Sequence, residues 1–148
     1  MNLILWRHAE ACDGPDDHSR ELTEKGRRQA TKMASFLREH LPANTRVLAS
    51  PAVRTQQTAA ALTDEFTTVP TIALGASAHA VLQAVRWPRA DETVLVVGHQ
   101  PTLGAVAAQL LGCDTESLRI KKGGLWWINY REDTSELTLR LVITPEFM

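Results

Sequence analysis

Two arginines and two histidines stand at or just beyond the ends of short apolar runs, where their chemistry could be combined. Arg7 and His8 end the first run, Arg54 follows the second by one helical turn, and His99 ends a third. Guanidinium forks bind pairs of phosphate oxygens, and a neutral imidazole is a nucleophile. These residue types indicate transfer of a phosphoryl group to a histidine, provided that the four side chains meet in one pocket.

This chemistry requires a neutral His8 and positive charge around the phosphoryl group. The guanidiniums of Arg7 and Arg54 disfavour protonation of His8, so we expect its imidazole to be neutral near physiological pH. The same guanidiniums would neutralise the equatorial oxygens as charge redistributes in the transition state. In-line attack by His8 would leave a phosphohistidine, which water would then hydrolyse.

The order of strands and helices predicts how these residues could meet. Apolar runs predict buried strands, the one containing Pro70 being a weaker edge candidate: Leu3–Trp6, Arg46–Ala49, Val69–Leu74 and Thr93–Gly98. Caps, stops and 3.6-residue spacing predict helices over Thr23–Leu41, Ser50–Phe66, Ser77–Arg86 and Pro101–Gly112. The chain closes with a predicted hairpin of Leu125–Tyr130 and Leu137–Val142.

Alternating strands and helices followed by a hairpin predict an α/β fold. We expect three α/β/α layers, with a mostly parallel central sheet and an antiparallel C-terminal hairpin. Arg7-His8, Ser50–Arg54 and His99 each lie where a predicted strand ends and the next segment begins. If the strands are parallel, these three junctions open on one sheet edge, where helix N-termini add amide donors. The four charged or ionisable groups would then surround one anion.

Composition restricts the classes of function. The chain has 148 residues, 44% of them hydrophobic and 22% charged, and we expect one domain over residues 1–148. Its net charge of -1 favours neither a nucleic-acid nor a membrane surface. Cys12 and Cys113 suggest no disulfide framework. The apolar run Met1–Trp6 is too short for the hydrophobic part of a signal peptide, so we expect a cytoplasmic protein.

Other motifs offer weaker alternatives. Cys113–Arg119 matches C-x5-R, but two carboxylates within it would repel phosphate, so we interpret it as a chance match. A zinc or iron site on His8 and His99 is opposed by neighbouring guanidiniums and lacks further ligands. We interpret the remaining histidines as packed or solvent-facing: His18, His40 and His79.

Several motifs together resemble one family. They are Leu5–Ala11 with its Arg-His-Ala core, Arg20-x-Leu22-Thr23-x-x-Gly26, Ser50-Pro51-x-x-Arg54-x-x-x-Thr58 and Val97–Pro101. This set is similar to the signature of the histidine phosphatase superfamily, which has the phosphoglycerate mutase-like fold. Alanine after the histidine, the short chain and the Arg20 element resemble its SixA-type branch, the protein phosphohistidine phosphatases.

The resemblance implies roles for individual residues. His8 would be the nucleophile, and Arg7, Arg54 and His99 would hold the phosphoryl oxygens. Arg20 would be an accessory substrate contact, and we also predict Ser50 to be substrate-binding. The resemblance also implies that the protein uses no metal and no organic cofactor.

One departure from the family pattern bears on the substrate. Phosphomonoesterases and mutases of the superfamily carry an acidic general acid after the third strand, and Gly75–His79 contains no carboxylate. An alkoxide leaving group needs such a proton donor more than an imidazole does. We therefore expect the substrate to be a phosphohistidine on a partner protein, for example a histidine phosphotransfer domain. We also expect the enzyme to be a monomer. Glu10 or His79 could still supply the proton. A small-molecule phosphomonoesterase and a non-catalytic phosphate-binding adaptor remain alternatives.

Overall fold

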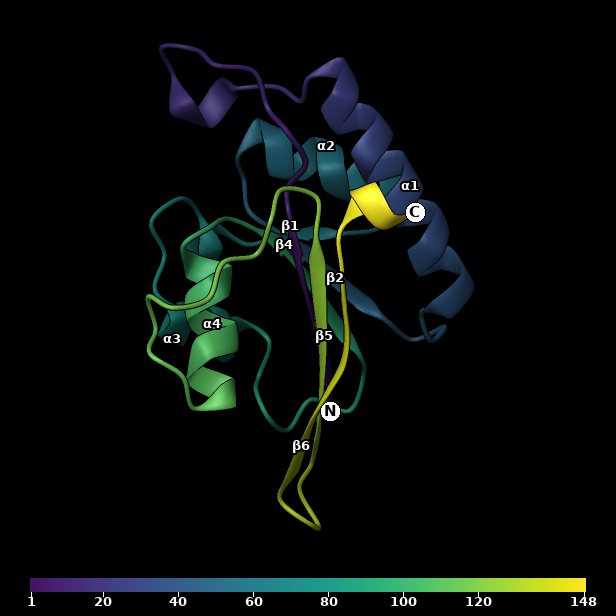
Figure 1. Ribbon diagram of the computed structural model, residues 1–148, viewed down its shortest axis with the longest axis vertical. Helices are drawn as coiled ribbons and strands as arrows, with labels where there is room; N and C mark the ends of the chain where they lie inside the picture. Colours follow the sequence, from purple (N-terminus) through teal and green to yellow (C-terminus); the bar gives the residue numbers. More distant parts are fainter.

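A six-stranded sheet runs through the molecule in the order β3-β2-β4-β1-β5-β6. The computed structural model describes residues 1–148, shown in Figure 1. Its strands are β1 (Asn2–Arg7), β2 (Arg46–Ala49), β3 (Thr67–Thr68), β4 (Val94–Gly98), β5 (Leu125–Arg131) and β6 (Glu136–Ile143). Its α-helices are α1 (Glu24–His40), α2 (Val53–Leu62), α3 (Ala78–Ala84) and α4 (Thr102–Leu111). The predicted α/β fold is confirmed.

Three parallel strands form the centre of the sheet and end at the same edge. β4 pairs in parallel with β1 and with β2, so that Arg7 lies opposite Gly98 and Ala49 opposite Val97. Both β1 and β4 are buried on both faces, which explains their unbroken apolar sequences. The residues that follow these strands therefore emerge together, as expected from the sequence.

Helices cover both faces of the sheet (Figure 1). Leu3 and Leu5 pack in the core that includes residues of α3 and α4. Ile4 and Trp6 point the other way, into the core formed with α1. This alternation along β1 produces the three predicted layers.

Local signals in the sequence set most helix ends. Thr23 caps α1 by accepting a hydrogen bond from the backbone N–H of Gly26, and Ser77 caps α3 in the same way. Gly112 ends α4 with φ of 73°, a left-handed conformation that glycine adopts without strain.

The C-terminal hairpin also forms as predicted, with Trp127 buried and Trp126 partly exposed. None of the helices is long and apolar enough to cross a membrane.

The predicted strand over Val69–Leu74 is wrong. The edge strand β3 consists of Thr67–Thr68 only, and the 3-10 helix η2 (Pro70–Ile72) replaces the rest. Pro70 has no N–H to donate to a strand neighbour, and its fixed φ suits the first turn of a helix. Helix α2 also ends at Leu62 rather than near Phe66, because Thr63 has extended backbone. Neither change moves a junction that carries the predicted site.

Candidate active site

His8 lies just beyond β1 with its backbone held on both sides. Its N–H donates to the carbonyl of Gly98 at 3.1 Å, and its carbonyl accepts from Gly123 at 3.0 Å. The ring nitrogen Nδ1 lies 2.8 Å from the carbonyl oxygen of Ala9. A carbonyl can only accept, so this contact requires the ring proton on Nδ1. The lone pair of the neutral ring is then on Nε2.

The surroundings of His8 keep its imidazole neutral. Burial lowers its pKa to about 3, and electrostatic repulsion between a protonated His8 and His99, Arg54 and Arg7 acts in the same direction. The hydrogen bond to Ala9 opposes this shift but is the smaller effect. The neutral His8 expected from the sequence therefore has a structural cause, although burial contributes more than the arginines.

Arg54 brings its guanidinium to the free nitrogen of His8. It lies in the first turn of α2 and is only 3% exposed. Its Nε donates to Nε2 of His8 at 3.3 Å. One turn later, the hydroxyl of Thr58 donates to the carbonyl of Arg54 and accepts from the N–H of Ala9. Thr58 thus ties the start of α2 to the backbone beside His8.

Arg7 lies on the other side of this cluster. Its Nη1 donates to the carbonyl of Ile120 at 3.0 Å, and its buried Nε has no hydrogen-bond partner within the protein. Burial, followed by repulsion from Arg119 and Arg54, lowers its pKa to about 10. Arg7 therefore remains charged at neutral pH and has a donor available for an anion.

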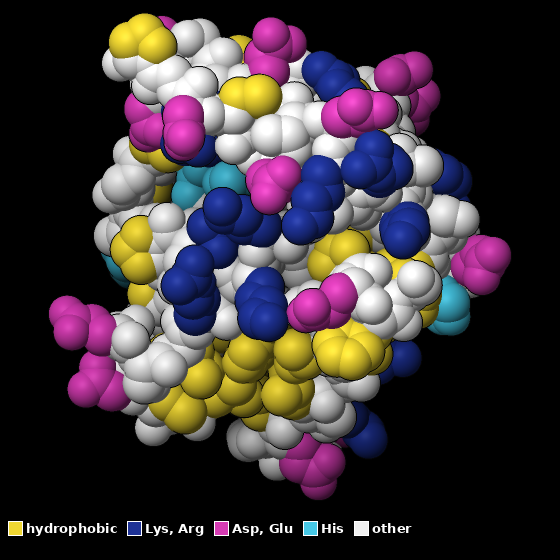
Figure 2. All heavy atoms as spheres, turned by 45° about the horizontal axis from the view of Figure 1, so that its top comes forward, with side chains coloured by type: hydrophobic (Ala, Val, Ile, Leu, Met, Phe, Trp, Pro, Cys, Tyr) yellow, Lys and Arg dark blue, Asp and Glu magenta, His cyan; other side chains and the backbone are white.

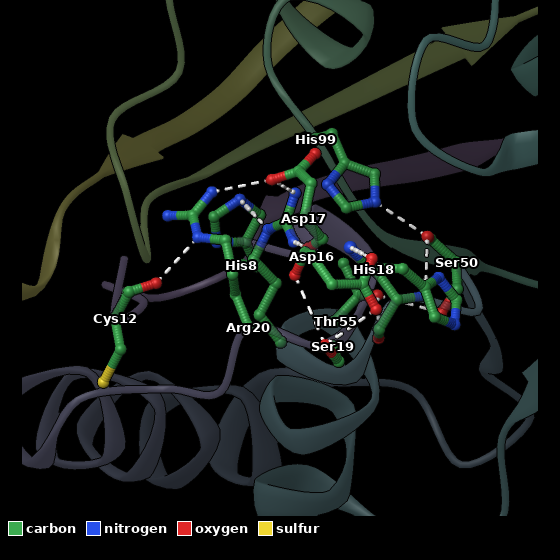
Figure 3. Close-up of polar contacts among 12 residues, drawn as sticks. His8, Cys12, Asp16, Asp17, His18, Ser19, Arg20, Ser50, Thr55 and His99 are labelled. Atoms are coloured by element: carbon green, nitrogen blue, oxygen red, sulfur yellow. Dashed lines mark hydrogen bonds and ion pairs between the residues drawn. The ribbon is translucent and has the colours of Figure 1, made fainter. Parts of the chain in front are cut away.

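His99 and Ser50 complete the sheet-edge group. Nε2 of His99 lies 2.7 Å from the Ser50 hydroxyl (Figure 3). Burial lowers the pKa of His99 to about 4, with Arg54 next in effect. Its ring centroid is 5.4 Å from that of His8, and its buried Nδ1 has no partner. Like the Nε of Arg7, this nitrogen is available to a bound group.

Arg20 reaches the cluster through Asp17. Its Nε donates to the carbonyl of Cys12 at 2.7 Å, and its Nη1 lies 2.9 Å from the Asp17 carboxylate. The same carboxylate is 3.5 Å from Nη2 of Arg54, and Arg54 also donates to the Asp17 carbonyl. Hydrogen bonding from Arg20 is the main cause that lowers the pKa of Asp17. Figure 3 shows Asp17 among these cations.

Sequence reasoning missed Asp17. It lies in the stretch after His8 in which only Glu10 and Arg20 are predicted from the sequence as candidate site residues. Its position three residues before Arg20 could have indicated an ion pair across the one-turn helix η1 (Asp17–Ser19). The sequence contained no signal for the approach of Asp17 to Arg54, because their contact depends on how the loop folds back.

Two candidate acids lie outside the hydrogen-bonded cluster. The Glu10 carboxylate accepts from the hydroxyl of Thr23 at 2.7 Å. His79 is exposed on α3 and makes no side-chain hydrogen bond. Neither side chain hydrogen-bonds to His8, Arg54 or His99.

The weaker alternatives from the sequence gain no support from the geometry. Cys113 of the C-x5-R match is exposed. No three His, Cys, Asp or Glu side chains come together as a potential metal site.

Sequence comparison places this cluster in a family. The pattern of the histidine phosphatase superfamily (branch 1) matches residues 3–74. A phosphohistidine phosphatase SixA homolog of Haemophilus influenzae is 30% identical over 128 residues, covering 76% of this chain and 78% of that protein. The chain belongs to the histidine phosphatase superfamily. An uncharacterised protein of Mycobacterium tuberculosis is 38% identical over 108 residues, and the match covers 70% of this chain and 68% of that protein.

Solved structures identify the branch of the superfamily. A SixA-type protein from Nakamurella multipartitia superposes with a TM-score of 0.78 at 33% identity, covering 97% of this chain and 95% of that one. The protein histidine phosphatase SixA complexed with tungstate gives 0.77 at 25% identity, covering 99% of both chains. This member of the histidine phosphatase superfamily is therefore SixA-like, which supports a phosphatase activity.

Proposed function

We propose that this protein is a metal-independent phosphohistidine phosphatase that acts through a phosphorylated His8. One observation carries the proposal: Nδ1 of His8 is committed to the Ala9 carbonyl, so the unprotonated Nε2 is directed at the guanidinium of Arg54. A nucleophilic nitrogen beside a fixed cation is the arrangement needed to attack a phosphoryl group and neutralise its oxygens.

The reaction then follows in two steps. Nε2 of His8 attacks phosphorus, the bond from phosphorus to the substrate imidazole breaks, and the electron pair leaves with that imidazole. A proton on the other nitrogen of the substrate ring lets it leave as neutral imidazole. Water next attacks the phosphorus on His8, releasing inorganic phosphate and restoring the neutral ring.

Arg7, Arg54 and His99 hold the phosphoryl group during both steps. The Nε of Arg7 and the Nδ1 of His99 have no partners within the protein. Each can donate to a phosphoryl oxygen, His99 doing so in the tautomer with its proton on Nδ1 and with Nε2 accepting from the Ser50 hydroxyl. Arg54 already faces the nucleophile. Arg20 and Ser50 are supporting groups, because Arg20 lies across Asp17 from Arg54 and Ser50 orients the ring of His99.

The acid groups near the site favour a phosphohistidine over a phosphate ester. An ester oxygen leaves poorly without a proton donor, whereas a protonated imidazole leaves well. Asp17 is the carboxyl group in contact with the cluster, and Arg20 lowers its pKa, so it is ionised at neutral pH. The names of the similar SixA proteins support the same substrate class.

A small-molecule phosphomonoesterase is the second candidate, and Asp17 is the observation that favours it. Its carboxyl group contacts Arg54, and it acts electrostatically on His99. If substrate binding displaced Arg20 from Asp17, the carboxyl group could become protonated and donate to an alkoxide. This candidate requires Asp17 to be essential for turnover.

A substrate panel separates the two candidates. Purified protein is assayed with a phosphohistidine-bearing phosphotransfer protein, free phosphohistidine, sugar phosphates and nucleotide monophosphates, with His8→Ala as the control. We expect kcat/KM to be highest for phosphohistidine and no activity in His8→Ala. A clear preference for an ester, lost in Asp17→Asn, would replace the first candidate by the second. Phosphate binding without turnover of any substrate would instead indicate an adaptor.

A further inference from the structure

A second, strongly basic feature lies beside the His8 cluster. It is a groove of about 830 Å³ between α1, the segment after α4 and the C-terminal 3-10 helix η3 (Pro145–Phe147). Six cationic residues line what we call the basic groove: Lys25, Arg28, Lys32, Arg119, Lys121 and Lys122. Figure 2 shows them as a band of Lys and Arg running past the histidines.

Most of the positive charge in the basic groove is not neutralised. Lys25, Lys32, Arg119 and Lys122 are exposed and have no ion-pair or side-chain hydrogen-bond partner. Every other Lys or Arg in the chain has at least one polar partner, including Arg7, Arg38 and Arg140. All the cations without a partner therefore gather on one surface, although the net charge of the chain is -1.

The basic groove is joined to the His8 pocket through one segment. Ile120, between Arg119 and Lys121, accepts the hydrogen bond from Arg7. Gly123, directly after Lys122, donates to the carbonyl of His8. Arg119 is also close enough to lower the pKa of Arg7. An anionic surface bound in the groove would therefore lie next to the pocket that receives the phosphoryl group.

We infer that the basic groove docks an acidic surface of the protein that presents the phosphohistidine, an inference that rests on the proposed function. Complementary charge at such a surface speeds association and orients the partner. The reacting imidazole is itself too small to select its carrier. A separate docking surface next to the pocket would supply that selectivity.

The lining of the groove favours a protein over other anions. Pockets for small molecules are mostly apolar, and this lining has no large apolar or aromatic side chain. Bases of single-stranded nucleic acid would find no ring to stack on. Glu10 and Glu146 also line the groove, and they would repel a compact polyphosphate. A protein surface can pair with both signs, placing its own cations opposite these glutamates.

The test reverses charge in the groove without touching the His8 cluster. The variant Lys25→Glu/Lys32→Glu changes two unpaired cations on α1. The control Arg89→Glu/Arg131→Glu makes the same change in net charge at two exposed arginines paired with Glu132 and Asp133. Each protein is assayed on a phosphohistidine-bearing phosphotransfer protein with an acidic surface and on free phosphohistidine. Thermal unfolding confirms that the variants are folded.

We expect the groove variant to lose about tenfold in kcat/KM on the protein substrate, through KM, and to stay within about twofold on free phosphohistidine. Added salt should reduce wild-type kcat/KM on the protein substrate and have less effect on the groove variant. The control should match wild type throughout. Equal losses on both substrates, or no loss on the protein, would overturn the docking inference while leaving the proposed function intact.

A binding measurement separates failure of docking from failure of the proposed function. A fluorescent Glu-rich peptide is titrated into wild type, His8→Ala and the groove variant, beside a single-stranded oligonucleotide and phosphatidylserine vesicles. Docking predicts that the peptide binds wild type and His8→Ala alike and binds the groove variant more weakly. If no substrate is hydrolysed but this pattern holds, only the proposed function fails. Tighter binding of the oligonucleotide or vesicles than of the peptide contradicts docking.

Discussion

The Nε of Arg54 lies 3.3 Å from Nε2 of His8, although the two residues are 46 positions apart in the sequence. His8 follows the central strand β1, and Arg54 begins the helix that leaves β2. Parallel pairing of both strands with β4 brings the two junctions together. The contact therefore depends on the topology of the sheet and not on any local motif.

Replacing Arg54 tests this contact. We expect Arg54→Ala to reduce kcat/KM on phosphohistidine roughly 100- to 1,000-fold, because a preorganised donor to the transition-state oxygens is lost. Arg54→Lys keeps the charge but not the planar fork, so it should recover only part of the loss. The exposed Arg38→Ala on α1 is the control and should retain activity. A kcat/KM for Arg54→Ala close to that of wild type would exclude Arg54 from the reaction.

Replacing Asp17 tests whether its carboxylate competes with the substrate anion or donates a proton to the leaving group. Its carboxylate occupies Arg20 and contacts Arg54, where it competes with an incoming anion. We expect Asp17→Asn to bind inorganic phosphate or tungstate several-fold more tightly, with kcat on phosphohistidine little changed. Inhibition constants and kcat measure the two effects. Asp13→Asn is the control, since Asp13 is exposed in the same loop. A large fall in kcat for Asp17→Asn alone would identify Asp17 as a catalytic acid.

The buried histidines predict how stability depends on pH. In the folded protein, burial lowers the pKa of His8 from 6.5 to about 3 and that of His99 to about 4. Below pH 6.5 the unfolded chain therefore binds more protons than the folded one, so stability falls as pH falls towards these values. The same shifts keep both rings neutral, and hence active, above about pH 5.

Thermal unfolding between about pH 4 and pH 7 measures this effect. The Tm of wild type should fall more steeply with decreasing pH than that of His8→Gln/His99→Gln, which lacks both titrating rings. Other acid-sensitive groups are common to the two proteins and cancel in the comparison. Parallel curves would show that the two histidines do not carry the shifts.

Gly26 provides a stability test of the loop that leads to the site. A Cβ at this position would collide with the carbonyl of Glu10, where α1 approaches the chain just after His8. We expect Gly26→Ala to lower the free energy of unfolding by about 2 kcal/mol or more, because backbone must move. Gly14→Ala, whose Cβ would meet only ordinary contacts, should change it by less than about 0.5 kcal/mol. Denaturant unfolding compares the two variants.

Much of the fold and of the residue cluster could be predicted because the signals were local. Apolar runs indicated β1, β2 and β4, and Thr23 and Gly112 marked one end each of α1 and α4, so the sheet edge with Arg7, His8, Ser50 and His99 followed. The predicted helix start at Ser50 is wrong, because α2 begins at Val53 after Ala52 and has no side-chain cap. Val69–Leu74 was misjudged because its apolar content resembles a strand, whereas Pro70 starts a 3-10 turn. Local sequence outweighed the apolar pattern there.

Two features of the candidate site could not be predicted. Asp17 reaches Arg54 only because the loop after His8 folds back over α2. The basic groove combines cations from α1 with cations from a segment about ninety residues later, and a net charge of -1 conceals this clustering. Both depend on long-range packing, which neither spacing nor composition records.

Trapping the phosphoenzyme is the most direct test that His8 is the nucleophile. Protein is mixed with a radiolabelled phosphohistidine-bearing protein, quenched in alkali within milliseconds to seconds, and digested for peptide mapping. We predict acid-labile, alkali-stable phosphate on the peptide that contains His8, formed and lost at rates compatible with turnover, and none in His8→Ala. Turnover without label on that peptide, or full activity in His8→Ala, would exclude His8 as the nucleophile.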